Sequence, residues 1–326
     1  LADLRFDGST NNPDYPLGNI VPAAGAPAGA KPVPGYDNVA NFFQTGVAYN
    51  NSIALSGGND NNTYYLSIAN STNKGVVPKN TFDRTNISLA SESKLSDKFK
   101  SETRLAYANS GGIRIQQGSN TSGVMLALMR MPPNFDITAG LDDPVNNRAS
   151  YMRPDGRQRN AYNTGGYDNP FWTVNMNQFK DIVNRLTGHT ALNYMANEWL
   201  TVTYRIGTDW YSDRRKQYFA RGSRTAPNGR IYEEQFFVQD INSDLLFAIN
   251  RRINEDITFN ALLGQNMFQT SFQNLYVQGD NLTVPEFYHL SNAATHITRE
   301  SKSKKRTAAL FADLGVSYKN MLYFNV

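Results

Sequence analysis

The sequence contains no cysteine, which excludes disulfide bonds, thiolate metal sites and cysteine nucleophiles. Long apolar runs are also missing: the longest, Val124 to Met129, is far shorter than the ~18 residues of a membrane-spanning helix. The opening residues, Leu1 to Arg5, lack the basic stretch and apolar core of a signal peptide. We therefore expect either that a signal was removed or that the sequence starts within a longer chain.

What remains combines polarity with many aromatic side chains. Hydrophobic residues make up 40% of the 326 residues and the mean hydropathy is −0.52, yet 18 Tyr and 18 Phe are present. Disordered chains are poor in aromatic residues, so this chain is expected to fold. The 32 Lys and Arg residues and the 28 Asp and Glu residues are interspersed and leave a net charge of +4. Because no basic stripe is present, nucleic-acid binding is not expected.

The composition and the hydrophobic pattern divide the chain into two parts. Residues 1–46 are predicted to be a connector or loop, because residues 18–34 consist largely of Ala, Gly and Pro. Residues 47–326 alternate apolar and polar side chains with a period of two, most clearly from Leu200 to Trp210, which predicts strands. Strand cores are expected at residues 47–56, 63–70, 85–94, 99–110, 183–194, 200–210, 236–250, 257–268, 308–318 and 321–326.

This alternation fits both a soluble sandwich and a membrane barrel, but connection lengths favour the barrel. Short connections alternate with long loops expected near residues 111–182, 211–235 and 269–307, an asymmetry typical of periplasmic turns and extracellular loops. The strand at 200–210 would cover about 23 Å after a 45° tilt, close to the ~25 Å apolar band of outer-membrane barrels. The predicted fold is all-β: part of a large transmembrane antiparallel β-barrel, with a solvated sandwich as the alternative.

A membrane location also predicts how the strands face. Leu200, Val202, Tyr204, Ile206 and Trp210 share one face, which would meet lipid. A cation that faced lipid near the midplane would cost ~2–4 kcal/mol. Four strand charges are therefore predicted to face the lumen: Glu102, Arg104, Arg205 and Asp209. Aromatic residues near strand ends would suit the two membrane interfaces: Tyr107, Tyr194, Trp199, Trp210, Tyr318 and Tyr323.

Six short motifs occur in order between about residue 42 and residue 326. They are Asn51 to Asp60 with Thr63 to Ser67; Lys74 to Val77 with Phe82 to Ile87; Asp168 to Trp172; Glu198 to Leu200 with Gly207 to Tyr211; Asp244 to Leu246 with Ala261 to Gly264; and the strand pair from Tyr318 to Val326. Through these motifs the sequence resembles the SusC/RagA-type TonB-dependent transporters of Bacteroidota outer membranes. Each motif is weak alone, and their common order is specific.

The resemblance implies a function and partners. Proteins of this type fold as 22-stranded barrels with an internal plug. They import oligosaccharides or peptides, with a SusD-like surface lipoprotein as lid and the TonB complex acting through the plug. The plug and roughly half of the barrel strands are not found in this sequence, and Phe324 to Val326 interrupt a strand. We therefore expect an internal portion of a multi-pass outer-membrane protein from a Gram-negative bacterium.

No catalytic set is apparent, so an enzyme is not expected. His189, His289 and His296 are the only histidines, and none belongs to a zinc-protease, serine-hydrolase or nucleotide-binding motif. A secreted or surface β-structural binding module is the alternative function, and a barrel hydrolase using His189 is a distant third. No metal or cofactor is expected. Calcium at Asp142-Asp143 or Asn59 to Asn62 is a minor alternative to turn chemistry, because the EF-hand spacing is absent.

The longest predicted loop carries the candidate site. Residues 122–130 are predicted to form a short helix that packs the loop over the barrel mouth. Aromatic faces in this loop suit sugar rings or could brace the loop against the barrel wall. The residues predicted to contact ligand or brace the loop are Tyr151, Tyr167, Asp168, Asn169, Phe171 and Trp172. Further along, the basic run Lys302 to Arg306 could meet lipopolysaccharide phosphates, although a solvated charge cluster is the favoured interpretation.

Overall fold

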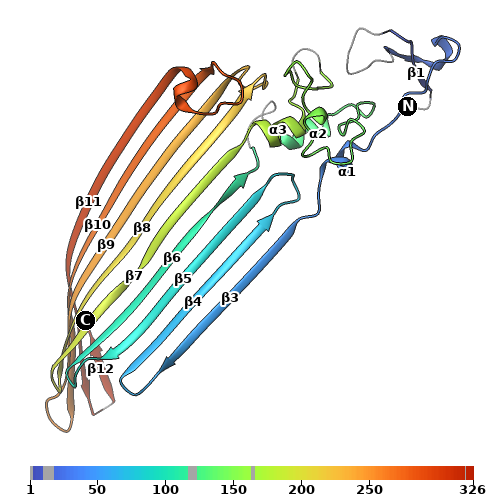
Figure 1. Cartoon of the computed structure of the whole chain (residues 1–326). Helices are drawn as coiled ribbons and strands as arrows, with labels where there is room; N and C mark the ends of the chain where they lie inside the picture. The colour runs from blue at the N-terminus through green and yellow to red at the C-terminus, as the bar shows by residue number, and fades with distance from the viewer. Residues whose placement is uncertain (1–2, 10–17, 117–122, 163–165, 320) are drawn as a thin grey trace.

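A computed structural model describes residues 3–9, 18–116, 123–162, 166–319 and 321–326. Its main element is an antiparallel sheet of ten strands, in which each strand pairs with its neighbour in sequence. The strands form a tilted, curved wall (Figure 1). They are β3 (Val47–Gly58), β4 (Asn62–Lys74), β5 (Thr81–Lys94), β6 (Phe99–Arg114), β7 (Phe179–Asn197), β8 (Leu200–Arg221), β9 (Asn228–Arg252), β10 (Ile257–Leu282), β11 (Ala293–Tyr318) and β12 (Leu322–Asn325).

The ten predicted strand cores are confirmed, but two of the three predicted long loops are wrong. Residues 211–235 and 269–307 are mostly strand, and the connections there are only residues 222–227 and 283–292. The reason is physical: in these segments both faces of the sheet carry polar residues, so the apolar alternation fades while backbone pairing continues. The first long loop does exist, between β6 and β7 at residues 115–178.

The tall strands extend far beyond a membrane-sized band. β10 and β11 contain 26 residues each, which corresponds to about 85 Å of extended chain. An apolar outward band of ~25 Å accounts for only part of that length, even after tilting. The upper parts of β8 to β11 therefore form a wall beyond the band, whereas β3 to β6 are shorter (Figure 1).

One face of the sheet carries a continuous exposed apolar surface, which we call the apolar belt. Cross-strand pairing places Leu55, Leu66, Leu89 and Leu105 in one row, and side chains directly opposite in antiparallel strands share a face. Leu310 on this face is 85% exposed, so no other part of the described chain covers it. The belt comprises Ile53, Leu55, Leu66, Ile68, Ile87, Leu89, Leu105, Tyr107, Leu192, Tyr204, Ile206, Phe247, Leu263, Met267, Leu310, Leu314 and Val316.

Aromatic pairs mark both ends of the belt. Phe99 and Tyr194 stack with ring centroids 4.6 Å apart near the short-turn end of the sheet. Trp210 meets Phe237 edge-on at 6.0 Å toward the other end. Aromatic side chains flanking an apolar band are typical of outer-membrane barrels.

The segment before β3, predicted to be a connector or loop over residues 1–46, contains short strands and a short helix. β1 (Leu4–Phe6) pairs with β2 (Ile20–Pro22), and a 3-10 turn, η1 (Ala23–Gly25), follows. Helix α1 (Asn38–Phe42) begins after Asp37, whose carboxylate accepts a hydrogen bond from the backbone N–H of Ala40 at 2.9 Å. Capping of this kind fixes the start of a helix despite its Gly- and Pro-rich surroundings.

The remaining helices lie in the connections at the tall end of the sheet. The predicted short helix is confirmed as α2 (Val124–Met129). It is joined by η2 (Arg148–Ser150), α3 (Pro170–Met176) and η3 (Leu290–Asn292). Among the described residues, no helix has the length and apolarity to cross a membrane.

Candidate functional site

The long connection between β6 and β7 folds onto a hydrophobic core of its own, which we call the loop core. α1, α2 and α3 gather there, above the ends of the shorter strands (Figure 1). The core includes Val77 from the β4–β5 turn and Ala220 from the tip of β8, so it joins the loop to the sheet. Its buried members are Phe42, Val77, Val124, Leu128, Ile137, Tyr151, Met152, Phe171, Trp172, Val174, Met176 and Ala220.

Asn169 starts α3 and binds the loop on both sides. Its Oδ1 accepts a hydrogen bond from the backbone N–H of Phe171 at 2.8 Å, which caps the helix before Pro170. Its Nδ2 donates to the carbonyl groups of Ser150 at 3.1 Å and Arg159 at 2.8 Å. A fully buried amide with these partners anchors the segment around residues 150–160 to α3.

Trp172 links α3 to the connection between β8 and β9. The side chain is 1% exposed, and Tyr151 packs edge-on against it with ring centroids 6.5 Å apart. Its Nε1 donates to Ser223 Oγ at 2.9 Å, and that hydroxyl donates to Asn177 Oδ1 at 2.7 Å. The indole therefore fills the loop core while its polar edge is satisfied across the sheet boundary.

Asp168 is a buried carboxylate between the same elements. Its Oδ1 accepts hydrogen bonds from Gln158 Nε2 at 2.8 Å and from the backbone N–H of Arg224 at 2.9 Å. Burial raises the pKa of Asp168, and these two hydrogen bonds and the charge of Arg224 oppose the rise only in part. The carboxylate thus joins the loop to the β8–β9 connection, and its ionised form is disfavoured by burial.

These contacts divide the predicted site residues into two groups. Asp168, Asn169, Phe171 and Trp172 are at most 1% exposed, and Tyr151 is also buried, so their surroundings favour bracing over ligand contact. Tyr167 differs: it is half-buried, and Arg130 Nη1 donates to its hydroxyl at 2.7 Å while the guanidinium lies 5.5 Å from its ring centre.

The buried carboxylate gives a pH prediction. Because the folded pKa of Asp168 exceeds 3.8, the folded loop retains a proton that the unfolded loop has already lost. The stability from this group is full below pH 3.8 and decreases as pH rises through the folded pKa. Asp168→Asn should flatten this decrease, measured by hydrogen exchange of residues 168–177 corrected for intrinsic rate. Asp142→Asn, at an exposed position, should leave it unchanged; an unaltered slope in Asp168→Asn would contradict the assignment.

A second candidate region lies on the tall wall, on the face opposite the belt. Two-residue spacing and strand register place five aromatic side chains there. Phe219 meets Tyr232 at 6.4 Å, Tyr232 meets Tyr276 at 6.0 Å, and Phe236 meets Phe272 at 6.3 Å between ring centres. We call these five residues the mouth wall. Aromatic surfaces of this kind can stack on sugar rings or on apolar peptide side chains.

Charged and amide groups are interleaved with the mouth wall. Arg215 lies 4.7 Å from the Phe236 ring centre and forms an ion pair with Asp213 at 2.6 Å between Nη2 and Oδ2. Arg230 is paired with Asp280, and Asn274 Nδ2 donates to Glu234 Oε1 at 3.1 Å. The wall therefore offers flat apolar faces with hydrogen-bonding groups beside them, a combination suited to a polar, extended ligand.

The sequence analysis did not identify the mouth wall. Four of its residues fall in segments predicted to be loops, and Phe236 is the first residue of a predicted strand core. A usable signal was present: Phe272, Asn274, Tyr276 and Gln278 alternate with a period of two. Their alternation is between aromatic and polar residues on one face, not between apolar and polar faces. A search for apolar alternation therefore does not detect it.

The four charges predicted to face the lumen lie on one face of the sheet, opposite the belt. Arg104 Nε lies 3.0 Å from Glu102 Oε1, and Arg185 Nε donates to Asp209 Oδ1 at 2.9 Å. Arg205 donates through Nε at 3.0 Å and Nη2 at 2.8 Å to Asp244 Oδ2. Each charge has an opposite charge beside it, which lowers the cost of holding it inside a barrel.

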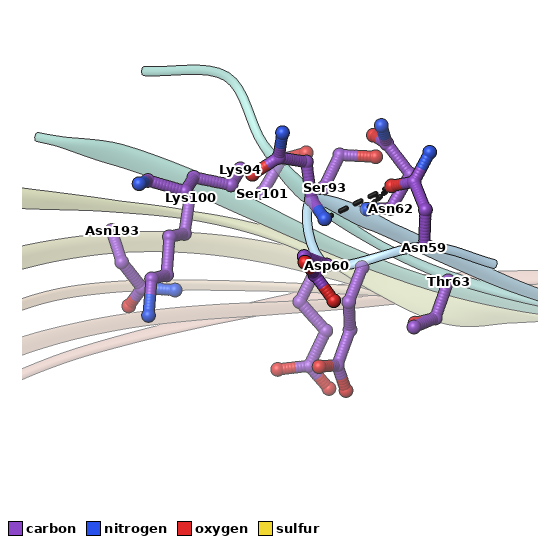
Figure 2. A pocket seen from close by; sticks show the side chains of 12 residues that line it. Asn59, Asp60, Asn62, Thr63, Ser93, Lys94, Lys100, Ser101 and Asn193 are labelled. Atoms are coloured by element: carbon purple, nitrogen blue, oxygen red, sulfur yellow. Dashed lines mark hydrogen bonds between the residues drawn. The ribbon is translucent and has the colours of Figure 1, made fainter. Parts of the chain in front are cut away.

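On the same face as these charges, at the short-turn end of the sheet, the turn from Asn59 to Asn62 borders a small hollow of about 240 Å³ (Figure 2). Asn59 Oδ1 accepts hydrogen bonds from the backbone N–H groups of Asn61 and Asn62, both at 2.9 Å, which is ordinary turn chemistry. Lys94 and Lys100 line the same hollow as Glu92 and Glu102. Within the described ranges, no group of three or more His, Asp or Glu side chains is arranged to hold a metal ion.

His189 stands beside charges. Directly opposite it in the sheet are Arg104 and Gly207, and its Nε2 lies 3.7 Å from Glu102 Oε1. No serine therefore faces His189 across either adjacent strand, as nucleophilic catalysis would need.

Comparison with known proteins relates the chain to one group of membrane proteins. No protein-family model matches the sequence. The TonB-dependent receptor P39 of Formosa agariphila is 24% identical over 292 residues, covering 85% of this chain. The RagAB peptide transporter has a similar fold, with a TM-score of 0.70 and 15% identity over 89% of this chain; its importer in the open-open state gives a TM-score of 0.68 and 16% identity.

The likeness confirms the resemblance that the six motifs indicate, and it shows the fold as part of a TonB-dependent transporter barrel. The chain spans only part of these proteins: it covers 25% of the length of the curated relative and 32% of the RagAB chain. The ten-stranded sheet is not closed into a barrel within the described residues.

Proposed function

We propose that this chain forms wall and outer loops of a SusC-like TonB-dependent transporter in the outer membrane of a Gram-negative bacterium. The observation that carries the proposal is the exposed apolar belt opposite a face of paired charges. A water-soluble protein rarely leaves an apolar surface of this extent uncovered, whereas a barrel turns such a surface toward lipid.

The open edges of the sheet support the same proposal. Within the described residues, β3 has no partner on its outer side, and β11 pairs with β12 only from Gly315 to Tyr318. Unpaired backbone groups in hydrocarbon cost several kcal/mol each, so both edges require further strands in a membrane. The short connections would then lie on the periplasmic side and the loop core outside the cell.

The proposed substrate is an oligosaccharide or a peptide. The mouth wall would contact it with aromatic faces and with the hydrogen-bonding groups of Glu234, Asn274 and Gln278. The loop core would keep its surroundings in place, and a SusD-like lipoprotein would close over the mouth. Release inward would follow when the TonB complex acts on a plug. We propose no catalytic step and no cofactor for this transport.

Genetic uptake assays test the function directly. The parent gene and the gene of a neighbouring surface lipoprotein would each be deleted in the native bacterium, and growth on defined oligosaccharides and on peptides would be followed. Loss of growth on one class, restored by the full-length gene, would identify the substrate class. A full-length parent that stays soluble without detergent and shows no heat-modifiable migration would contradict the proposal and favour a surface binding module.

Single substitutions in the mouth wall should weaken uptake without affecting insertion. Tyr276→Ala removes one stacking face, worth ~0.5–1.5 kcal/mol, so ligand affinity should fall about two- to twelvefold. Tyr49→Ala removes an exposed tyrosine from the belt side of β3 and should leave affinity unchanged. The measurement is ligand binding to the purified full-length transporter by calorimetry; equal affinities for both variants would exclude Tyr276 from the site.

A further inference from the structure

Cations stand at alternate positions on the outward face of β11, directly above the apolar belt. Arg306 and Lys304 share a face with Leu310 and Leu314, because even-numbered residues of this strand point the same way. They are paired in register with Gln269 and Ser271 of β10. Lys305, between them, points to the opposite face beside Thr270.

A hollow on the outward surface lies at the same place. Its volume is about 560 Å³, and its lining includes Ile241, Met267 and Ala308 on the belt side. Gln269 and Arg306 close it at the upper end, where Arg306 Nε donates to Gln269 Oε1 at 2.7 Å. This hydrogen bond holds the guanidinium at the rim of an apolar hollow and leaves its two Nη groups for another acceptor.

The charges at this rim are not neutralised locally. Lys302 forms an ion pair with Glu300 at 2.6 Å, but neither Lys304 nor Arg306 has an acidic partner in the described part of the chain. Cations at the level of lipid headgroups attract anionic lipids. A guanidinium also matches phosphate geometry through two parallel hydrogen bonds.

We propose that this hollow binds a phosphorylated outer-leaflet lipid, with its phosphate on Arg306 and Lys304 and an acyl chain against Ile241, Met267 and Ala308. The assignment rests on the proposed membrane function, because it requires the belt to face lipid. It commits to one occupant on two grounds: the sign of the charge at the rim and the apolar surface directly below it. A free anion would use only the rim, whereas the hollow extends into the belt.

The test uses the full-length transporter purified in detergent, with lipid binding followed by native mass spectrometry. The probes are bisphosphorylated lipid A, the same lipid without phosphates, and inorganic pyrophosphate. The double variant Lys304→Gln/Arg306→Gln should bind lipid A at least tenfold more weakly than the parent, and Lys305→Gln should bind as the parent does. The parent should bind the dephosphorylated lipid and pyrophosphate each at least tenfold more weakly than it binds bisphosphorylated lipid A.

The outcomes separate this proposal from the proposed function. Heat-modifiable migration and uptake report insertion and transport independently of lipid binding. If an inserted, transporting parent binds lipid A no better than the double variant does, the lipid site is wrong and the transporter proposal stands. Pyrophosphate binding as tight as lipid A binding would overturn the acyl-chain assignment. If the parent does not insert, both proposals fail.

Discussion

Replacing Trp172 with Ala is expected to release the loop core from the sheet. The indole is almost fully buried, and its Nε1 is bound to Ser223, so truncation leaves a cavity and removes one of the two hydrogen bonds of the Ser223 hydroxyl. Substitutions of buried aromatic residues by Ala typically cost ~3–5 kcal/mol. We expect residues 115–178 to become sensitive to protease in the intact transporter at concentrations that leave the parent loop uncut, with a matching loss of ligand capture.

Two controls define the origin of that effect. Tyr167→Ala truncates a half-buried aromatic residue of the same loop that lies outside the loop core, and its effect on protease sensitivity should be much smaller. Trp172→Phe keeps most of the packing but removes the hydrogen bond to Ser223, so its sensitivity should lie between the parent and the Ala variant. A Trp172→Ala variant whose loop is as resistant as that of the parent would remove the residue from the bracing network.

Placing an arginine in the centre of the belt should have the second large effect. Ile206 is outward-facing and 46% exposed, and it shares this face of β8 with Tyr204, Thr208 and Trp210. Ile206→Arg should destabilise the folded barrel in lipid by ~2–4 kcal/mol if this position lies near the bilayer midplane. The measurement is the reversible denaturant unfolding of the full-length protein in lipid vesicles.

The matched control lies three residues earlier on the same strand. Thr203 faces the side of Arg205, where its Oγ1 donates to Asn193 Oδ1 at 2.6 Å. Thr203→Arg loses that hydrogen bond but places its charge on a polar face, so a cost of about 1 kcal/mol is expected. Equal destabilisation by the two arginines would be inconsistent with a lipid-facing belt.

The part of the sheet that carries the belt could be predicted from the sequence, because there one face is apolar and the other face is polar. Leu200 to Trp210 alternate visibly because one side chain meets the belt and the next meets paired charges. Above the belt that contrast ends: Arg214, Arg215 and Lys216 are consecutive cations within a single strand. Strand pairing continues through backbone hydrogen bonds, which carry no signature in side-chain hydrophobicity.

The candidate site was predictable in part. The segment from Asp168 to Trp172 could be located because aromatic residues follow Asp, Asn and Pro there within the longest predicted loop, but helix α3, which starts at Pro170, was not predicted. Its burial beneath the β8–β9 connection depends on Ser223 and Arg224, more than 50 residues later, and local patterns do not contain that information. For the same reason, the mouth wall emerges only when strand pairing brings Tyr232 and Tyr276 together as diagonal neighbours on separate strands.

The central claim is that the two faces of β8 meet different solvents, and a cysteine scan of residues 200–210 tests it most directly. The described chain has no native cysteine, so each single-cysteine variant of this segment carries one label here. Spin labels in vesicle-embedded full-length protein would be probed with oxygen and with a water-soluble nickel chelate. We predict that labels at 202, 204 and 206 are relaxed by oxygen and labels at 203, 205 and 209 by nickel. Nickel access at every position, without alternation, would contradict the account.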